Sequence, residues 1–271
     1  MTAVPVPAGV PAVPVSGHGL LAGNVVLVTA AAGTGIGFST AQRCAEEGAT
    51  VVISDIHDRR LSEAADRLEE LTGRRPVARR CDVTSEEDVV ALFDLAVGEH
   101  GRVDVLVNNA GLGGTADLVD MTDDQWSRVL DVTLNGTFRC TRAALRHMRD
   151  RHGRSDSGGV IVNNASVLGW RAQPGQSHYA AAKAGVMALT RCAAMEAAAF
   201  GVRVNAVAPS LAMHPFLAKV TTEELLEDLT SREAFGRAAE PWEVANVIVF
   251  LASGYSGYLT GEVISVSSQH P

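Results

Sequence analysis

The stretch V-V-L-V-T-A-A-A-G-T-G-I-G, residues 25–37, decides the fold. Its apolar half predicts a buried β-strand, and its glycines predict a tight turn that opens into a helix. Glycines at such a turn let the main chain approach a pyrophosphate, which the free N–H groups of a helix N-terminus bind well. Glycine-rich turns also simply connect elements, so the motif alone leaves both interpretations open. The candidate ligand-binding residues are Thr29, Gly33, Gly35, Ile36 and Gly37.

Outward from this stretch, apolar runs alternate with amphipathic helical patterns. The predicted strands are residues 25–29, 50–54, 77–79, 103–107, 160–163, 202–207 and 263–266. The clearest predicted helices are residues 40–47, 60–71, 86–99 and 123–149. Near-continuous Val and Ile runs are typical of parallel strands with helices on both faces. The sequence therefore predicts an α/β fold: a single-domain, Rossmann-type doubly wound parallel sheet of about seven strands, with its ligand at the carboxyl ends of the strands.

The 271 residues suit one α/β domain, which we place at residues 20–271. Residues 1–19 are a proline-rich arm that we expect to be extended or disordered, because proline fixes φ and removes an amide donor. The arm lacks the basic region and unbroken apolar run of a signal peptide, and no later run is long enough to span a bilayer. We therefore expect a cytoplasmic protein. Residues 211–234, irregular and then helical, are the candidate mobile substrate segment.

The charge balance is acidic, with 23 basic and 31 acidic side chains and a formal net charge of −8. Such a chain lacks the positive surface that binds nucleic acid or anionic membranes, so we expect a small-molecule substrate as its partner. Cys44, Cys81, Cys140 and Cys192 form no C-x-x-C pair and lie in no His cluster at zinc spacing. The sequence therefore predicts no metal site and four buried free thiols in a reducing cytosol.

The second predicted strand ends near Asp55, about twenty residues after the glycine loop. A carboxylate there accepts hydrogen bonds from an adenosine ribose and repels a 2′-phosphate. Neither Ile56 nor Thr34 supplies a cation for that phosphate, which favours NAD over NADP. Arg59 and Arg60 follow closely and could compensate, although we interpret them as solvated charges at the start of a helix.

The motif Y-A-A-A-K, Tyr179 to Lys183, is the most informative in the chain. Lys183 and Lys219 are its two lysines, so the pairing is hard to attribute to chance. Residues four apart share a helix face, which brings the ammonium within reach of the phenol oxygen. A free tyrosine has a pKa of about 10, and we expect the ammonium and an oxidised nicotinamide to lower it toward a useful range.

Ser166 lies thirteen residues before Tyr179, just past the predicted strand at 160–163. Its hydroxyl can hold a substrate oxygen while Tyr179 transfers the proton, although a serine at a strand end is often only a turn or cap residue. Asn109, Ala110 and Gly111 follow another predicted strand. Asn and Gly tolerate the dihedral angles that a turn beside a flat cofactor needs.

Together these motifs resemble those of the short-chain dehydrogenase/reductase family, from Leu21 to Val266. The glycine loop, C-D-V at residues 81–83, N-N-A-G at 108–111, Ser166, Y-x-x-x-K and T-G-E near Thr260 follow in the family's order. Residues 164–185 look like the corresponding stretch of oxoacyl-thioester reductases. The resemblance implies a homotetramer or homodimer paired through the long helices at residues 123–149 and 177–200.

The resemblance also implies a set of site residues. Ser166, Tyr179 and Lys183 are the implied catalytic set, and Asp82 is the implied adenine contact. The implied cofactor-binding residues are Thr29, Gly33, Gly35, Ile36, Gly37, Asp55, Asp82, Val83, Asn109, Ala110, Gly111, Pro209 and Ala212, with Tyr179 and Lys183 at the nicotinamide ribose.

Four departures from the family pattern stand out. Ala30 or Ala31 takes the place of the first glycine of the loop, with Gly33 as its substitute. Thr133 stands where the family has a catalytic asparagine that holds a water through its main chain, which threonine could also do; Asn135 would point elsewhere. In residues 209–214 His214 replaces a threonine, although main-chain groups near Ala212 could still hold a carboxamide. Serines replace the glycines usual at 267 and 268.

The substrate is less well defined. Leu168, Trp170, Gln173, His214 and Phe216 would lie near the pocket in this fold, which indicates a bulky apolar substrate. Trp170 and Phe216 fit ordinary packing equally well. The segment V-L-G-W-R-A-Q is similar to relatives that act on coenzyme A thioesters of steroid-derived ring fragments.

The leading hypothesis is therefore an NAD-linked enzyme that interconverts a secondary alcohol and a ketone on a substrate such as a hydroxyacyl-CoA. An NADPH-dependent oxoacyl-thioester reductase is the alternative within catalysis. A catalytically silent NAD-binding sensor or scaffold is the alternative from another class.

Overall fold

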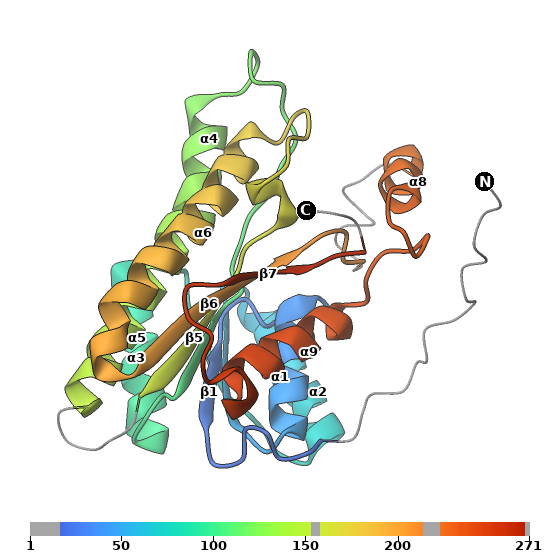
Figure 1. Ribbon diagram of the computed structural model, residues 1–271. Helices are drawn as coiled ribbons and strands as arrows, with labels where there is room; N and C mark the ends of the chain where they lie inside the picture. The colour runs from blue at the N-terminus through green and yellow to red at the C-terminus, as the bar shows by residue number, and fades with distance from the viewer. Residues whose placement is uncertain (1–16, 153–157, 214–222, 269–271) are drawn as a thin grey trace.

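The computed structural model describes residues 17–152, 158–213 and 223–268, and for residues 223–225 it describes the main chain alone. The proline-rich arm up to residue 16 lies outside the described residues, as does the middle of the segment 211–234. Seven strands form one sheet at the centre, with helices packed against it (Figure 1). Along the described ranges, no helix combines the length and apolar character needed to cross a membrane.

The sheet is parallel throughout, in the order β3-β2-β1-β4-β5-β6-β7. Its strands are β1 (Val25–Val28), β2 (Thr50–Asp55), β3 (Val77–Arg80), β4 (Val105–Asn108), β5 (Gly159–Asn164), β6 (Val202–Pro209) and β7 (Val263–Val266). This confirms the predicted fold. The order reverses between β1 and β4, and in doubly wound sheets the ligand crevice opens at the carboxyl ends of the strands beside that point.

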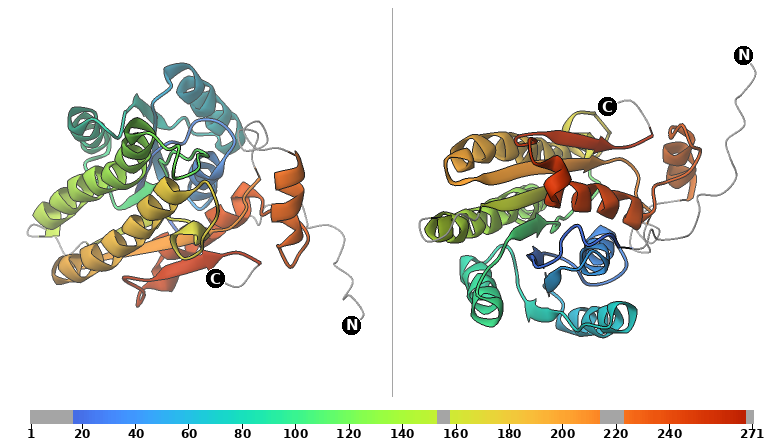
Figure 2. Two further views of the ribbon diagram at one scale, coloured as in Figure 1. Left: turned by 90° about the horizontal axis from the view of Figure 1, so that it is seen from above. Right: turned by 60° about the horizontal axis from the view of Figure 1, so that its bottom comes forward.

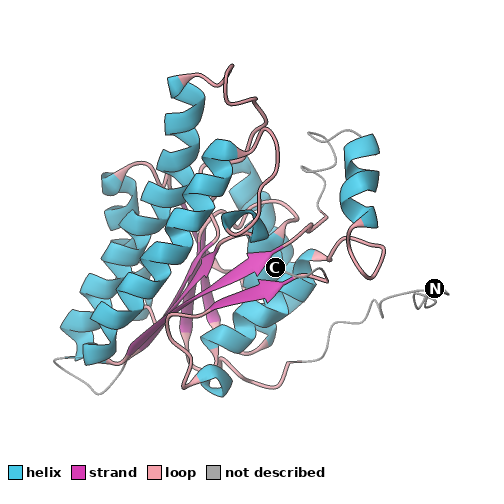
Figure 3. Cartoon of the chain, turned by 45° about the horizontal axis from the view of Figure 1, so that its top comes forward, coloured by secondary structure: helices cyan, strands magenta, loops and turns pink. Residues whose placement is uncertain are grey.

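Helices cover both faces of the sheet, as Figures 2 and 3 show. One face carries α1 (Ile36–Glu46), α2 (Asp58–Thr72) and α9 (Pro241–Ala252). The other carries α3 (Glu86–His100), α5 (Gly136–His152) and α6 (Ser177–Ala197), with α4 (Asp123–Leu130) against α6. Helix α8 (Glu223–Ser231) stands apart from the sheet (Figure 1).

The four residues of β1 are buried on both faces and divide between two cores. Val26 and Val28 pack into the core under α1, α2 and α9, whereas Val25 and Leu27 pack into the core under α3 and α5. Alternate residues of a strand point to opposite faces, so a run of four apolar residues suits this double burial. The uniform V-V-L-V pattern is therefore the signature of a central strand.

The helix predicted over residues 123–149 is continuous in the structure but contains a π-helical turn. Helix α4 ends at Leu130, a π-helical turn spans Asp131–Asn135, and α5 begins at Gly136. The turn places the Thr133 hydroxyl against the main chain of Leu112, to which it is bonded at 3.0 and 3.1 Å. Single π turns inside α-helices are frequent at functional sites, and this one brings a side chain to the crevice.

Helix α9 is an element that the sequence analysis did not predict. Its run V-A-N-V-I-V-F-L-A is nearly continuously apolar, so it resembles a buried strand as much as a helix. The local signals were Pro241 in the first turn and the capping box between Glu240 and Glu243.

A buried ion pair ties α1 to the start of the described chain. Arg43 Nη2 donates to Glu47 Oε1 at 3.0 Å, and both side chains are buried. Glu47 Oε2 accepts the main-chain amides of His18 at 2.8 Å and Leu20 at 3.1 Å. Burial acts to raise the pKa of Glu47, but the two amides and the Arg43 charge outweigh it, so this pKa lies below its ordinary value.

We expect Glu47→Gln to lower the free energy of unfolding at pH 7 by about 1–3 kcal/mol, because it removes one of the two carboxylates that pair with the buried Arg43 guanidinium. A carboxyl whose pKa is lower in the folded state stabilises the protein above its ordinary pKa, and this contribution is lost as the pH falls through the lowered value. Urea unfolding at several pH values should therefore show the gap to wild type closing below pH about 4. Glu69→Gln, in an exposed pair with Arg75, is the control. If the difference in free energy of unfolding between wild type and Glu47→Gln stays constant down to low pH, the charged form of Glu47 is not the stabilising group.

Candidate active site

The predicted catalytic residues meet at the carboxyl edge of the sheet. Ser166 follows β5 by two residues, and Tyr179 and Lys183 lie one turn apart in the first half of α6. A hydrogen bond joins Ser166 to the Tyr179 hydroxyl. The Lys183 ammonium lies 5.5 Å from the centre of the Tyr179 ring. The three side chains form one cluster, as the spacing predicted.

Lys183 is a buried cation with one recorded hydrogen bond. Its Nζ donates to the carbonyl of Asn164 at 2.5 Å, and 3% of the residue is exposed. Burial lowers the pKa of Lys183 from 10.5 to about 8. The group is therefore poised to exchange a proton near neutral pH, which an exposed lysine is not.

The expected lowering of the Tyr179 pKa by the ammonium together with an oxidised nicotinamide stays a prediction. Burial raises the pKa of Tyr179, and the hydrogen bond with Ser166 only partly opposes this. Desolvation disfavours the phenolate, and it outweighs the neighbouring groups. The spacing of the two residues predicts that Lys183 lies near Tyr179, but it does not predict how deeply Tyr179 is buried.

Hydrogen bonds connect the N-N-A-G turn to the glycine loop. The Thr29 hydroxyl accepts the amides of Asn109 at 3.0 Å and Ala110 at 3.1 Å, and donates to the carbonyl of Val107 at 3.4 Å. The Asn109 Nδ2 donates to the carbonyls of Thr29 and Ala30 at 3.3 and 3.0 Å. A Cβ on Gly111 would lie 3.5 Å from the Lys183 Nζ, so this turn reaches the lysine.

The glycine loop fits a dinucleotide. Ala30 has φ +50°, the left-handed region that usually needs glycine, and Gly33 has φ +98°. Ala30 thus adopts a conformation that glycine usually provides, and Gly33 adds a second left-handed position. Gly35 caps α1 with no side chain bonded to the first-turn amides. A helix N-terminus with uncapped amides is the arrangement that binds a pyrophosphate.

Asp55 ends β2 beside this loop. Its carboxylate accepts the amides of Ala32 at 3.3 Å and His57 at 3.0 Å. Burial raises the pKa of Asp55, opposed by the Ala32 amide and the Arg60 charge. Arg59 pairs with Glu63 on the exposed face of α2, at 3.5 Å. A fixed carboxylate therefore borders the loop, with Arg60 near enough to act on it.

Comparison with known proteins agrees with this geometry. Residues 30–268 match the family model described as enoyl-(acyl carrier protein) reductase. The chain belongs to the short-chain dehydrogenase/reductase family. Members bind a nicotinamide cofactor, and this chain is an NAD(P)-dependent oxidoreductase that acts on CH–OH groups.

Three relatives are informative. A reductase of Mycobacterium tuberculosis (strain H37Rv), named for (5R,7aS)-5-hydroxy-7a-methyl-1-oxo-2,3,5,6,7,7a-hexahydro-1H-indene-carboxyl-CoA, is 66% identical, over 95% of this chain and 97% of its own. The 3-oxoacyl-acyl-carrier-protein reductase of Thermotoga maritima is 41% identical over 91% of this chain and 97% of its own. A crystal structure of a short-chain dehydrogenase from Mycobacterium smegmatis superposes with TM-score 0.83, at 62% identity, over 95% and 97% of the two chains.

Thr133, where the family pattern has asparagine, bonds elsewhere. Its hydroxyl is bonded to both main-chain groups of Leu112, and its carbonyl accepts the Thr137 hydroxyl at 2.8 Å. Asn135 bonds Asp131 on the exposed side, so it does point away as predicted. Water binding by the Thr133 carbonyl stays a prediction.

Two other predicted cofactor regions have defined main-chain structure. Asp82 Oδ1 accepts the amide and hydroxyl of Thr84 at 2.9 and 2.7 Å, and Val83 packs against the start of α5 at Gly136. Ala212 pairs with Ala239 in a short parallel bridge that uses the Leu211 carbonyl and the Met213 amide. The main-chain groups of Ala212 itself take no part in these two bonds. Ala212 lies three residues after Pro209, which ends β6. Their cofactor contacts stay predictions.

The predicted substrate-pocket residues are only partly placed. Leu168, Trp170 and Gln173 line a shallow depression together with Ser177, Ala180, Ala181 and Ala184 of α6. By helical periodicity that face of α6 is opposite to Tyr179 and Lys183, so this depression is not the space beside the phenol. His214 and Phe216 lie outside the described residues.

The cysteine prediction needs one correction. Cys44, Cys81 and Cys140 are free and buried, but Cys192 is exposed, because it lies on the outer face of α6. Burial raises the pKa of Cys44 and Cys81 to about 12, which makes these thiols inert. In the described part of the chain, no group of three or more His, Cys, Asp or Glu side chains is placed to hold a metal ion.

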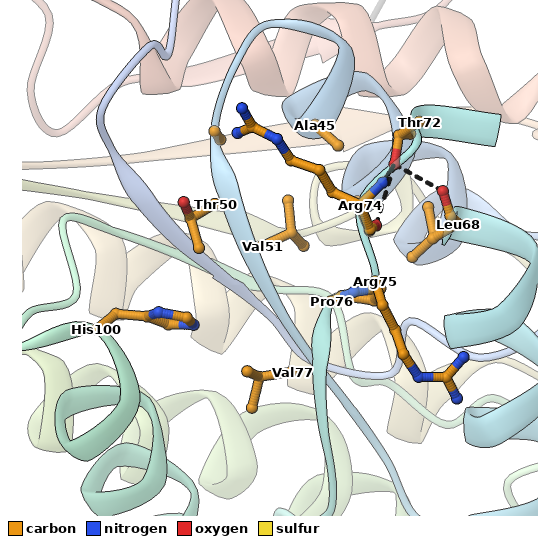
Figure 4. A pocket seen from close by; sticks show the side chains of 12 residues that line it. Ala45, Thr50, Val51, Leu68, Thr72, Arg74, Arg75, Pro76, Val77 and His100 are labelled. Atoms are coloured by element: carbon orange, nitrogen blue, oxygen red, sulfur yellow. Dashed lines mark hydrogen bonds between the residues drawn. The ribbon is translucent and has the colours of Figure 1, made fainter. Parts of the chain in front are cut away.

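A small cavity of about 90 Å³ lies at the other end of the sheet (Figure 4). Its lining includes Thr50 and Val77, at the starts of β2 and β3, and apolar residues of α1 and α2. The side chains of Arg74 and Arg75 extend in opposite directions, and Thr72 donates to the Leu68 carbonyl at 2.6 Å. The Ser166–Tyr179–Lys183 cluster lies past the opposite ends of the strands, so this cavity is not part of the candidate active site.

Asn164 is the residue that sequence reasoning missed. It ends β5, accepts the Lys183 ammonium through its carbonyl and donates through Nδ2 to Asn109 Oδ1 at 3.0 Å. The signal was present as N-N-A-S, polar residues that directly follow the apolar run V-I-V.

We expect Lys183→Met to raise the free energy of unfolding at pH 8, because methionine fills the site without burying a charge. The pKa of Lys183 is 10.5 when exposed and about 8 when folded. Between these values the unfolded state binds more protons, so the stability of wild type rises with pH and the gap to the variant narrows. Urea unfolding from pH 7.5 to 10.5 measures both effects. A variant less stable than wild type at pH 8 would show that the ammonium is a net stabilising group.

Proposed function

We propose that Ser166, Tyr179 and Lys183 carry out an NAD-linked interconversion of a secondary alcohol and a ketone on a bulky, fused-ring acyl thioester. The observation that carries this proposal is the buried Ser166–Tyr179–Lys183 cluster beside the glycine loop. The sequence of the relative named for a hydroxy-methyl-oxo-hexahydroindene-carboxyl-CoA supports the substrate class, at 66% identity over nearly the whole chain.

Each residue has a distinct task. For oxidation, the Tyr179 oxygen takes the proton of the substrate hydroxyl, and Ser166 holds the same oxygen in place. Lys183 provides positive charge beside the phenol, which favours the phenolate against the burial that disfavours it. When bound, the nicotinamide provides the hydride acceptor or donor.

Two glycines next to Tyr179 and His178 support a bulky substrate. Gly113 faces the Tyr179 ring, and a Cβ there would lie 3.8 Å from it. Gly114 faces His178, with a corresponding distance of 3.4 Å to Nε2. Gly113 and Gly114 place no side chain against the Tyr179 ring or His178, which favours a fused ring system over a slender acyl chain.

Asp55 supports NAD. Its carboxylate is held by the amides of Ala32 and His57 at the end of β2, where an adenosine ribose binds in doubly wound folds. A negative charge at this place repels a 2′-phosphate. The described neighbours of Asp55 offer Arg60 as the compensating cation, and its charge acts on Asp55 itself.

An NADPH-dependent oxoacyl-thioester reductase is the second candidate. The 41% identity to the Thermotoga maritima reductase favours it, since that protein is named for an acyl-carrier-protein substrate. Both candidates use the same catalytic residues, so substrate and cofactor preference separate them. A silent NAD-binding sensor would bind the dinucleotide without turnover.

We further propose assembly as a homotetramer or homodimer. Trp126 of α4, Phe138 of α5 and Met195 of α6 are 36%, 42% and 80% exposed, on helices of one face of the sheet. Tryptophan, phenylalanine and methionine are enriched at protein interfaces, which supports this proposal. A cytoplasmic location stays a prediction.

We expect Tyr179→Phe to lower kcat by about 100- to 10,000-fold, the usual contribution of a positioned acid or base, while the Kd for the dinucleotide changes less than about threefold. Steady-state kinetics with hydroxyacyl-CoA and ketone substrates, together with fluorescence titration of NADH, measures both. Tyr255→Phe, on an exposed tyrosine, is the matched control. Retention of a substantial fraction of wild-type turnover would exclude Tyr179 as the proton donor and acceptor.

We expect Asp55→Ala to reduce the preference for NAD over NADP by roughly tenfold or more in kcat/KM, because it removes one charge that repels the 2′-phosphate. Asp55→Asn is the matched variant: it keeps the size and the acceptor oxygen for the Ala32 amide but not the charge. An unchanged preference in both variants would rule out Asp55 as the selecting group.

A further inference from the structure

Asn164 connects the catalytic lysine to the glycine loop. Its carbonyl accepts the Lys183 ammonium at 2.5 Å, and its Nδ2 donates to Asn109 Oδ1 at 3.0 Å. Its Oδ1 is buried and has no hydrogen-bond partner among the described residues. The side chain therefore makes one recorded bond, and that bond goes to Asn109.

This bond determines which way the Asn109 amide faces. Asn109 Nδ2 donates to the carbonyls of Thr29 and Ala30, at 3.3 and 3.0 Å. A flipped amide would place its oxygen against those two carbonyls and its NH₂ against the NH₂ of Asn164, so both contacts would be repulsive. The Asn164 donor thus selects the orientation in which Asn109 binds the loop.

The loop needs such support because Ala30 is strained. Within the described ranges Ala30 is the one non-glycine residue with positive φ, at +50°. An L-residue persists in this region only where its surroundings hold it. The Asn109 bond to the Ala30 carbonyl is such a constraint, and it lies where the loop turns toward α1.

Gly37 shows how closely this contact is packed. A Cβ on Gly37 would lie 2.4 Å from the Ala30 carbonyl oxygen and 2.4 Å from Asn109 Nδ2, the two atoms of the hydrogen bond. The first turn of α1 therefore packs directly on the Ala30–Asn109 contact. A shift of Ala30 would move the helix N-terminus that provides the uncapped amides.

We infer that the Asn164 side chain is a positioning residue for dinucleotide binding: it orients Asn109 and thereby holds the strained Ala30 turn of the glycine loop. The inference rests on the proposed function, in which this loop holds the dinucleotide. Because the Asn164 carbonyl also binds Lys183, one residue connects the two halves of the site.

The test is the Kd of NADH, measured by fluorescence titration without substrate, in Asn164→Ala and Asn163→Ala. Asn163 is the matched control, because its amide bonds Asn108 and Thr190 in the core and not Asn109. We expect Asn164→Ala to weaken binding about tenfold, the effect of losing one buried hydrogen bond, and Asn163→Ala to leave the Kd within about twofold. Wild-type affinity in Asn164→Ala would overturn the inference.

Rescue separates positioning from general damage. Glycine adopts φ +50° without strain, so Ala30→Gly added to Asn164→Ala should restore the Kd to within about twofold of wild type. Failure of this rescue would mean that Asn164 does not act through Ala30. If thermal melting shows that Asn164→Ala does not fold, Asn164→Ser, whose hydroxyl is too short to reach Asn109, replaces it in both measurements.

Gly37→Ala distinguishes failure of this inference from failure of the proposed function. Its Cβ would break the Ala30–Asn109 contact, and we expect NADH and NADPH binding to fall below detection in a folded variant. Wild-type binding in Gly37→Ala would show that the glycine loop does not bind the dinucleotide, and the inference about Asn164 would fail with it. Loss of binding in Gly37→Ala with wild-type binding in Asn164→Ala would remove the Asn164 inference alone.

Discussion

The hydroxyl of Thr29 joins the two strands between which the sheet reverses its order. Thr29 lies just past β1. Its hydroxyl donates to the Val107 carbonyl of β4 and accepts the amides of Asn109 and Ala110 in the turn after β4. An unpaired buried amide costs roughly 1–3 kcal/mol, so this hydroxyl stabilises the point at which the two segments separate. With it, β1 continues into the glycine loop, β4 continues into the N-N-A-G turn, and a crevice opens between them.

The chemistry of the site follows from that separation. The two diverging segments are held by asparagine amides rather than by a strand ladder, so polar groups line the crevice while apolar strands surround it. Lys183 is buried against this polar lining, with the Asn164 carbonyl as its acceptor. Burial lowers the pKa of Lys183 to about 8 and raises that of Tyr179 above its ordinary value, so the two groups, whose pKa values are similar in water, move apart in acidity. The buried Lys183 charge reduces the stability of the fold.

Thr133, which stands where the family pattern has asparagine, lies in the π turn next to the loop that follows β4. The threonine hydroxyl binds both main-chain groups of Leu112 through a π turn, which joins the α4–α5 connection to the loop next to the phenol. Leu112 precedes Gly113 and Gly114, which lie next to Tyr179 and His178. Thr133 is thus connected through Leu112 to the segment beside the Tyr179 ring.

The amino-acid sequence by itself determined the parallel sheet, its seven strands and the grouping of Ser166, Tyr179 and Lys183. These depend on short-range periodicity and on spacing within one helix, both of which are local properties. Tertiary structure alone decided the rest: the strained Ala30, the Asn109–Asn164 contact, the π turn at Thr133, the exposed Cys192 and the raised pKa of Tyr179. Helix α9 was missed because a continuous apolar run has no period. Contacts across 55 residues and the desolvation of a side chain depend on which segments meet in space, and no local pattern records that.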